Sequence, residues 1–110
     1  MAPWVTQLRK GLAELSVLAA LEHEEAYGYQ IVDRLKAVAG LELTESTVYP
    51  LLARLAAGRF LSVRTVDSPS GPPRRYYRLT ELGRKRYYSL VGQWKTIRES
   101  VNLMIEGAKS

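Results

Sequence analysis

The sequence predicts a mostly α-helical fold with one small β-hairpin and a long C-terminal helix. Three observations lead to this fold class. Apolar residues recur at helical spacing from Trp4 onward, alternate with polar residues over 60–66, and return to unbroken helical spacing after Thr80. The chain has 110 residues, 46% of them hydrophobic and 25% charged, which is the ordinary balance of a single globular domain. The predicted order is helix, helix, helix, strand, strand, long helix.

The first two helices follow from apolar periodicity and from their boundaries. Apolar residues occur every three or four positions from Trp4 to Leu21, which predicts a helix with a broad apolar face. The polar stretch 23–26 ends this helix. A second helix follows Tyr27-Gly28-Tyr29 and ends near Gly40, because glycine commonly occupies the position just past a helix end.

The third predicted helix has a start that a proline constrains. Thr44 or Ser46 can cap it, since either hydroxyl can accept a hydrogen bond from a free backbone N–H of the first turn. Pro50 is tolerated without cost only in the first turn, so a start near Ser46 or Thr47 is favoured. Gly58 ends the helix. Its inward face is apolar and comprises Val48, Leu51, Leu52 and Leu55.

The hairpin follows directly. Residues 60–66 alternate apolar and polar side chains, as a strand with one buried face does. The segment 67–73 is rich in proline, serine and glycine and predicts a hairpin tip, and 75–79 predicts the returning strand. Thr80 can cap the last helix. This order of elements is typical of a winged helix-turn-helix, which we expect residues 1–79 to form.

The last helix has the sharpest periodicity in the chain. Its apolar residues alternate spacings of three and four, which predicts a coiled-coil seam of about three heptads. A helix over 80–107 would be roughly 42 Å long, too long for so small a core to cover. We therefore expect residues 80–110 to pack with the first helix in one compact unit and to form a homodimer through this seam. A seam that packs wholly within one chain is the alternative. The predicted interface comprises Tyr87, Leu90, Trp94, Ile97, Val101 and Met104.

Positive charge is concentrated in the second part of the chain. Residues 1–45 contain four Lys/Arg and seven Asp/Glu, a net of −3, whereas residues 46–110 contain twelve and four, a net of +8. A run of charge can be no more than a solvated face. Here it coincides with the helix–hairpin pattern, which favours double-stranded DNA as the partner, with the helix in the major groove and the hairpin on phosphates or in the minor groove.

The candidate DNA-binding residues lie on two elements. On the third helix, the side chains that point away from the apolar face offer hydroxyls, an aromatic ring and a guanidinium to base edges and phosphates. In the alternative interpretation, Ser46 and Thr47 only cap the helix and Tyr49 packs on a neighbour. On the hairpin, three arginines lie close to the tip. The full set of candidates is Ser46, Thr47, Tyr49, Pro50, Arg54, Arg64, Arg74 and Arg75.

A tryptophan in the middle of the seam suggests a ligand site. Trp94 stands where leucine or isoleucine is the ordinary choice. Two such indoles facing each other across a dimer axis would pack poorly and could leave a flat slot for a planar aromatic molecule. Trp4 is the candidate for a second wall of that slot. In the alternative, the two tryptophans simply fill their own space.

Several classes of function are disfavoured. The chain has no cysteine and a single histidine, His23, in a charged link. There is no glycine-rich phosphate loop, no metal-ligand spacing and no nucleophile beside a base, so we expect neither an enzyme nor a bound cofactor or metal. No run of 18 apolar residues occurs, so we expect no membrane partner. The absence of a secretion signal and of cysteines predicts a cytoplasmic location.

Three segments together resemble the PadR family of bacterial transcriptional regulators, in its short form. They are Tyr-Gly-Tyr-Gln-Ile at 27–31, Ser-Thr-Val-Tyr-Pro-Leu-Leu-Ala-Arg-Leu at 46–55 and Arg-Tyr-Tyr-Arg-Leu-Thr-Glu-Leu-Gly at 75–83. The resemblance implies a homodimeric repressor whose winged helix-turn-helix units are joined through long C-terminal helices. It also implies a site for flat aromatic compounds at a tryptophan in the dimer interface, a position that Trp94 matches.

The sequence thus predicts a sequence-specific DNA-binding transcriptional regulator, a repressor that binds an inverted-repeat operator as a homodimer and responds to a planar aromatic ligand. Two other interpretations stay open. The first is a winged-helix protein-interaction module whose basic face recognises an acidic partner. The second is a small-ligand carrier whose DNA contacts are vestigial.

Overall fold

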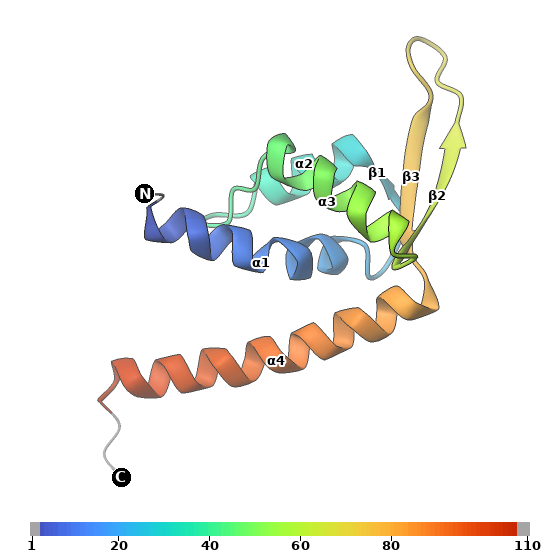
Figure 1. Ribbon diagram of the computed structural model, residues 1–110. Helices are drawn as coiled ribbons and strands as arrows, with labels where there is room; N and C mark the ends of the chain where they lie inside the picture. The colour runs from blue at the N-terminus through green and yellow to red at the C-terminus, as the bar shows by residue number, and fades with distance from the viewer. Residues whose placement is uncertain (1–2, 108–110) are drawn as a thin grey trace.

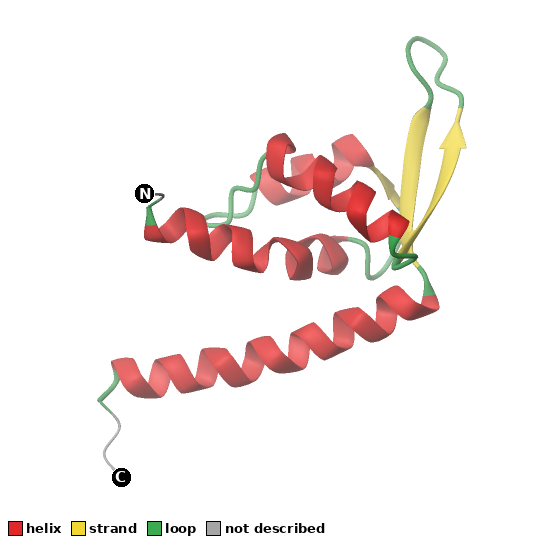
Figure 2. Cartoon of the chain, viewed as in Figure 1, coloured by secondary structure: helices red, strands yellow, loops and turns green. Residues whose placement is uncertain are grey.

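A computed structural model describes residues 3–107. Residues 1–2 of the predicted winged helix-turn-helix (1–79) and residues 108–110 of the predicted dimerisation segment (80–110) lie outside the described range. The mostly helical fold with a small β-hairpin is confirmed (Figures 1 and 2). The helix periodicity and the alternating strand pattern therefore identified these elements correctly. In chain order the elements are α1 (Trp4–Ala20), β1 (Ala26–Tyr27), α2 (Gly28–Lys36), α3 (Glu45–Ala57), β2 (Leu61–Val66), β3 (Arg74–Leu79) and α4 (Glu81–Ile105).

The sheet has three antiparallel strands in the order β1-β3-β2, one more than the sequence predicted. The additional strand, β1, is two residues long, and Ala26 pairs with Tyr77 while Tyr27 pairs with Tyr76. Two residues are too few to show an alternating pattern, so only the pairing with β3 reveals the strand. It ties the start of α2 to the base of the hairpin, whose tip projects beyond the helices (Figure 1).

One apolar core joins the first three helices to the base of the sheet. α1, α2 and α3 each turn an apolar face inward, and β2 and β3 contribute Leu61, Tyr77 and Leu79. Complete burial of one such aliphatic side chain is worth about 1.5–3 kcal/mol, so this core holds α3 and the hairpin in a fixed relation. The largest side chains with essentially no exposure are Val17, Leu18, Leu21, Ile31, Val32, Val48 and Leu52.

The third helix begins one residue earlier than the favoured start. It opens at Glu45, with Thr44 at the cap position and the Thr44 carbonyl accepting hydrogen bonds from the backbone N–H groups of Thr47 and Val48. Pro50 is therefore the sixth residue of α3 and lies just beyond the first turn. The helix accommodates the ring at an exposed position, while the burial of the face that contains Val48 stabilises the turn around it.

The start of α4 is fixed tightly against the turn between α3 and β2. As predicted, Thr80 caps the helix, and its Oγ1 accepts a hydrogen bond of 2.9 Å from the Gly83 N–H. The same hydroxyl lies 2.7 Å from the Arg59 carbonyl oxygen. A side chain at Gly83 would place its Cβ 1.9 Å from the Phe60 carbonyl oxygen, so this close approach requires glycine.

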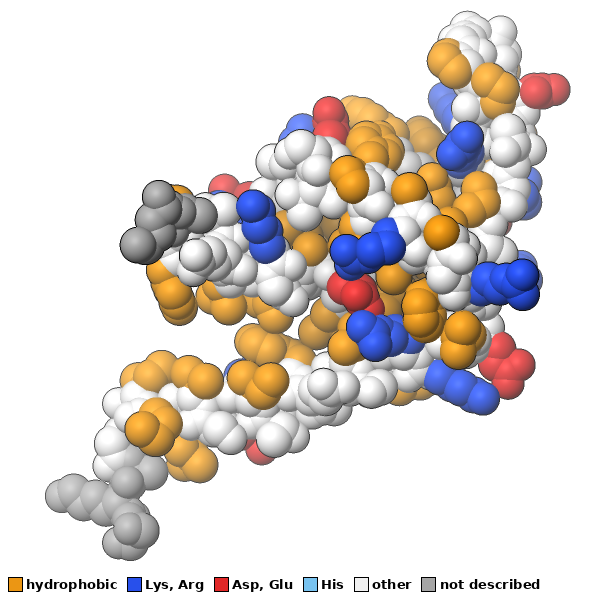
Figure 3. All heavy atoms as spheres, in the orientation of Figure 1, with side chains coloured by type: hydrophobic (Ala, Val, Ile, Leu, Met, Phe, Trp, Pro, Cys, Tyr) orange, Lys and Arg blue, Asp and Glu red, His pale blue; other side chains and the backbone are white. Residues whose placement is uncertain are grey.

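α4 is partly covered by α1 and partly uncovered. In its first turns the Arg86 Nε donates a hydrogen bond of 2.6 Å to Glu14, and the Tyr87 hydroxyl donates one of 3.1 Å to Glu22. Farther along the seam, Ile97 is 57% exposed and Met104 is 82% exposed. Figure 3 shows apolar side chains on the facing sides of α1 and the far part of α4, with an opening between them. A single chain therefore leaves the C-terminal part of the seam without cover.

None of the helices within residues 3–107 is long and apolar enough to cross a membrane.

Candidate nucleic-acid interface

The predicted outward face of α3 is at the surface. Ser46, Tyr49, Pro50 and Arg54 are exposed and Thr47 is half-buried, whereas the opposite face of the helix is buried in the core. The exposed positions recur at spacings of three and four, so they form one stripe along the helix. An α-helix fits the width of a DNA major groove, and this stripe is the face of α3 that would meet the bases.

The first turn of α3 has polar groups that are not used by the fold. The hydroxyls of Thr44 and Ser46 lie 3.0 Å apart and contact each other, and neither side chain caps the helix. Thr44 therefore occupies the predicted cap position, but the expected hydrogen bond from its hydroxyl to the first turn is not formed. Because Pro50 has no N–H, the Ser46 carbonyl lacks its usual partner four residues later. The Ser46 carbonyl thus lacks its helical partner, and the Ser46 hydroxyl, which contacts the Thr44 hydroxyl, lies at the surface.

Tyr49 extends from α3 to Gly28 at the start of α2. It is 42% exposed, and burial of the rest of its ring raises the pKa of its hydroxyl, with smaller contributions from Glu45, Tyr77 and Tyr29. Its ring borders a groove of 680 Å³ between α3 and the hairpin. The groove is lined by Tyr27, Gly28, Tyr29, Tyr49, Ala53, Pro72, Pro73, Arg74, Arg75 and Tyr77.

The three candidate arginines of the hairpin are divided between the two faces of the sheet. The strand register places Arg75 opposite Thr65 and two residues from the buried Tyr77, on the face toward α3. Arg64 and Arg74 occupy the alternate positions of the strands, so their backbone positions belong to the outer face. Arg74, the first residue of β3, also borders the groove beside α3. The sequence placed all three on the hairpin, where the structure also has them, and the strand pleat divides them between its faces.

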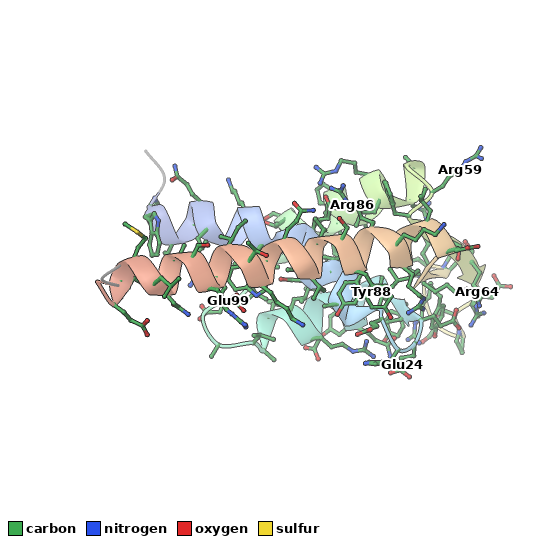
Figure 4. All side chains as sticks on the ribbon, turned by 90° about the horizontal axis from the view of Figure 1, so that it is seen from below. Glu24, Arg59, Arg64, Arg86, Tyr88 and Glu99 are labelled. Atoms are coloured by element: carbon green, nitrogen blue, oxygen red, sulfur yellow. The ribbon has the colours of Figure 1, made fainter. Side chains whose placement is uncertain are left out.

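On the outer face, Arg64 is held by an acid that the sequence analysis did not single out. The Arg64 Nε donates a hydrogen bond of 3.0 Å to Glu25 Oε2, and a second guanidinium nitrogen contacts Glu25 Oε1. The guanidinium also lies over the Tyr76 ring, 4.8 Å from its centroid. These hydrogen bonds lower the pKa of Glu25 and raise the pKa of Arg64. Figure 4 shows Arg64 at the strand end of the molecule.

A ladder of rings and cations continues across the outer face. Tyr76 meets Tyr27 edge to face, with ring centroids 5.4 Å apart, and Arg74 lies 4.7 Å from the centroid of the Tyr27 ring. Aromatic pairs and cation–π contacts of this kind each contribute roughly 0.5–1.5 kcal/mol. The ladder stiffens the base of the hairpin while Arg74 stays exposed and can contact a phosphate. The sequence carried no signal for the role of Glu25, which belongs to the polar stretch 23–26 after the first helix.

Arg54 is the one cation of α3, and its side chain is accessible. It is 71% exposed and its guanidinium lies 3.6 Å from Glu14, the same carboxylate that binds Arg86 on α4. Such an exposed ion pair is weak, so a phosphate can replace the carboxylate at little cost. Arg86, by contrast, links α4 to α1, which accounts for a basic side chain near the start of that helix.

Trp94 and Trp4 do not share a cavity within one chain. Trp94 is half-buried beside a hollow of 250 Å³ between α1 and α4, with Leu12 and Leu90 among its neighbours. Trp4 is 74% exposed near the start of α1, about 12 Å along the helix axis from Leu12.

No group of three His, Cys, Asp or Glu side chains within residues 3–107 could hold a metal ion.

Comparison with known proteins identifies the family. Residues 17–89 match the family model described as Transcriptional regulator PadR-like family. The structure is similar to the PadR-like transcription factor from Bacteroides fragilis, at 41% identity, with a TM-score of 0.75 and coverage of 90% of this chain and 95% of that one. It is also similar to a PadR family transcriptional regulator from Eggerthella lenta, at 32% identity, with a TM-score of 0.82 and coverage of 93% and 88%.

Two further relatives extend the comparison. An uncharacterized protein from Lysinibacillus sphaericus is 27% identical over 100 residues, which are 89% of this chain and 92% of that protein. Bacillus subtilis PadR, solved in complex with operator DNA, is 25% identical with a TM-score of 0.64, over 71% of this chain and 45% of that chain. The match over most of the chain agrees with the resemblance found in the sequence, and the prediction that the protein is not an enzyme is confirmed. The chain belongs to the PadR-like family of transcriptional regulators.

Proposed function

We propose that this protein is a homodimeric repressor that binds double-stranded DNA at an inverted-repeat operator. The observation that supports it most is the exposed polar stripe of α3 beside a groove whose far wall bears Arg74 and Arg75. A helix with free donors and acceptors next to a cationic hairpin suits a duplex, because the helix meets base edges while the hairpin meets phosphates. A structure of similar fold has been solved with operator DNA, which favours the same use of this scaffold.

Each candidate residue has a distinct proposed role. Ser46, Thr47 and Tyr49 would donate or accept hydrogen bonds at base edges, and Pro50 would contact a thymine methyl group. Arg54, Arg74 and Arg75 would neutralise phosphates on either side of the groove. Arg64 would join them only after exchanging Glu25 for a phosphate. Its contribution should therefore be smaller than that of Arg74 and Arg75, which have no ion pair with an acid among the described residues, or of Arg54, whose ion pair with Glu14 is longer.

The proposed homodimer is formed by the uncovered seam. Ile97, Val101 and Met104 are all exposed on α4, and Trp4, Val5 and Leu8 are exposed on α1. Contiguous exposed apolar side chains at heptad spacing favour a second helix as their partner. Two copies joined in this way would present their α3 helices to half-sites about one helical turn, roughly 34 Å, apart.

The proposed aromatic effector would bind near Trp94, where a hollow already separates α1 from α4. Because Trp4 lies too far along α1 to border that hollow within one chain, its proposed role depends on the second subunit. A ligand bound between the long helices can release DNA only by the difference in its affinity for the two arrangements. Quenching of tryptophan emission by a planar aromatic dye, lost in Trp94→Ala, is the expected result. Unchanged dye binding in that variant would remove this part of the proposal.

Operator selection followed by a salt titration tests the DNA-binding function. A duplex selected from a random library should carry an inverted repeat, and fluorescence anisotropy should give tight binding to it. If about six to eight phosphates are neutralised per dimer, log K should fall against log salt with a slope of roughly −5 to −7. Binding that is indifferent to both sequence and salt would contradict the proposal.

A further inference from the structure

Gly28, the first residue of α2, lies directly under the ring of Tyr49. A Cβ added at this position would be 2.8 Å from Cε1 of Tyr49, a distance that real Cβ atoms essentially never show. The backbone of Gly28 lies outside the left-handed region, so an L-residue could adopt its conformation. The close approach of the ring, and not a turn, is therefore what calls for glycine here.

The entry of the chain into α2 does not depend on this glycine. Gln30 secures it, since its Oε1 accepts a hydrogen bond of 3.1 Å from the Tyr27 backbone N–H. The pairing of Tyr27 with Tyr76 fixes the residue before Gly28 to the sheet. Gly28 is thus flanked by well-held backbone, and the three atoms nearest to an added Cβ all belong to the ring of Tyr49.

The position of that ring matters because it borders the groove between α3 and the hairpin. Tyr49 comes from the outward edge of α3, while Pro73 and Arg75 come from the opposite wall. A ring that rests on Gly28 lies low against the start of α2 and leaves the groove open. A ring pushed away from Gly28 would move toward the space that a DNA strand would occupy between α3 and the hairpin.

We infer that Gly28 is a positioning residue for DNA recognition, because the absence of its side chain sets where the Tyr49 ring lies and so which base pairs α3 prefers. The inference rests on the proposed DNA-binding function. It assigns a role in sequence preference to a residue that lies outside α3 and outside the hairpin. It also predicts that the effect of any side chain at 28 passes through Tyr49 alone.

A double-mutant cycle tests the inference with the full-length protein and the selected operator. Gly28→Ala should weaken binding on the order of 10-fold, comparable to the loss of one base contact, and should relax the preference at one position in each half-site. In a Tyr49→Ala background the same change should alter affinity by less than about 2-fold, since the ring is already absent. Equal losses in both backgrounds would overturn the inference.

Gly92→Ala is the matched control. Gly92 is a helical glycine on α4 with nothing within 4 Å of an added Cβ, and it lies on the side away from the seam. Its replacement should leave affinity and sequence preference unchanged. A loss of binding equal to that of Gly28→Ala would show that the effect is not specific to the Tyr49 contact and would overturn the inference.

A measurement without DNA separates this inference from the proposed function. In protein with 13C-labelled tyrosine rings, the Tyr49 resonances, assigned with Tyr49→Phe, should shift in Gly28→Ala and stay in place in Gly92→Ala. Unshifted Tyr49 resonances, or shifted resonances with unchanged sequence preference, would overturn the inference while the function stands. If the wild-type protein selects no duplex, the proposed function fails, and the role in DNA recognition fails with it even where the ring moves.

Discussion

The two ends of the molecule differ in how complete they are within one chain. At the hairpin end, charged and aromatic side chains already have partners, as Arg64 has in Glu25 and Arg74 has in the Tyr27 ring. At the far end of α4, Ile97 and Met104 expose apolar surface to water. Polar groups can be satisfied by solvent or by a single acid, whereas apolar surface is stabilised only by burial. The side chains at the hairpin end are thus already held in place within one chain, whereas the apolar side chains at the end of α4 would be stabilised by packing against a second chain.

The largest expected effect comes from breaking the proposed seam. Val101→Glu places two like charges near each other across the proposed dimer axis and should convert the protein to a monomer. Because a monomer contacts only one half-site, operator affinity should fall by more than about 100-fold. Sedimentation velocity and anisotropy measure the two results.

Asn102→Glu is the control for that change, since it adds the same charge at the adjacent exposed position, off the seam. It should leave both the oligomeric state and the affinity close to those of the wild type. A dimer that survives Val101→Glu would contradict the proposed interface.

A medium effect should separate the two faces of the hairpin. Arg75 lies on the face toward α3 and has no ion-pair partner among the described residues, so Arg75→Ala should weaken operator binding by about 5- to 10-fold. The salt slope should become shallower by about one unit for each subunit. Arg64→Ala removes the same type of side chain from the outer face and should cost less affinity, because Glu25 already neutralises that guanidinium. Equal losses would show that the faces do not differ.

The smallest effect should come from Glu25→Gln. This change keeps the shape of the side chain and removes the charge that holds Arg64. It should raise DNA affinity slightly, by about 2- to 3-fold, and steepen the salt slope. A decrease in affinity would instead mean that the Glu25–Arg64 pair orients the hairpin for binding.

The same variant also has a pH signature. The hydrogen bonds from Arg64 lower the pKa of Glu25 in the folded protein. The Glu25–Arg64 pair therefore stabilises the folded state above the ordinary pKa of glutamate, and this contribution is lost as the pH falls through the lowered pKa of Glu25. The difference in Tm between wild type and Glu25→Gln should therefore shrink from about pH 7 to about pH 3. The pair is exposed, so the difference should be small at every pH.

Much of the fold was predictable because the signals are local. Period 3.6 identified the helices, alternation identified β2, and Thr80 at the start of α4 was recognised by its capping chemistry. The outward stripe of α3 followed from the positions of its apolar residues. The start of α3 was displaced by one residue, because burial of its inner face tolerates Pro50 beyond the first turn. The strand β1 was missed, because two residues carry no period.

By itself, the amino-acid sequence determined the element types, the faces of the helices, the excess of positive charge from residue 46 onward and the family resemblance. These depend on residues a few positions apart, whose relation the backbone geometry already dictates. Only the tertiary structure decided which acid holds Arg64, which carboxylate Arg54 and Arg86 share, and that Tyr49 rests on Gly28. Those contacts join residues from separate elements, and packing of the common core is what brings such residues together.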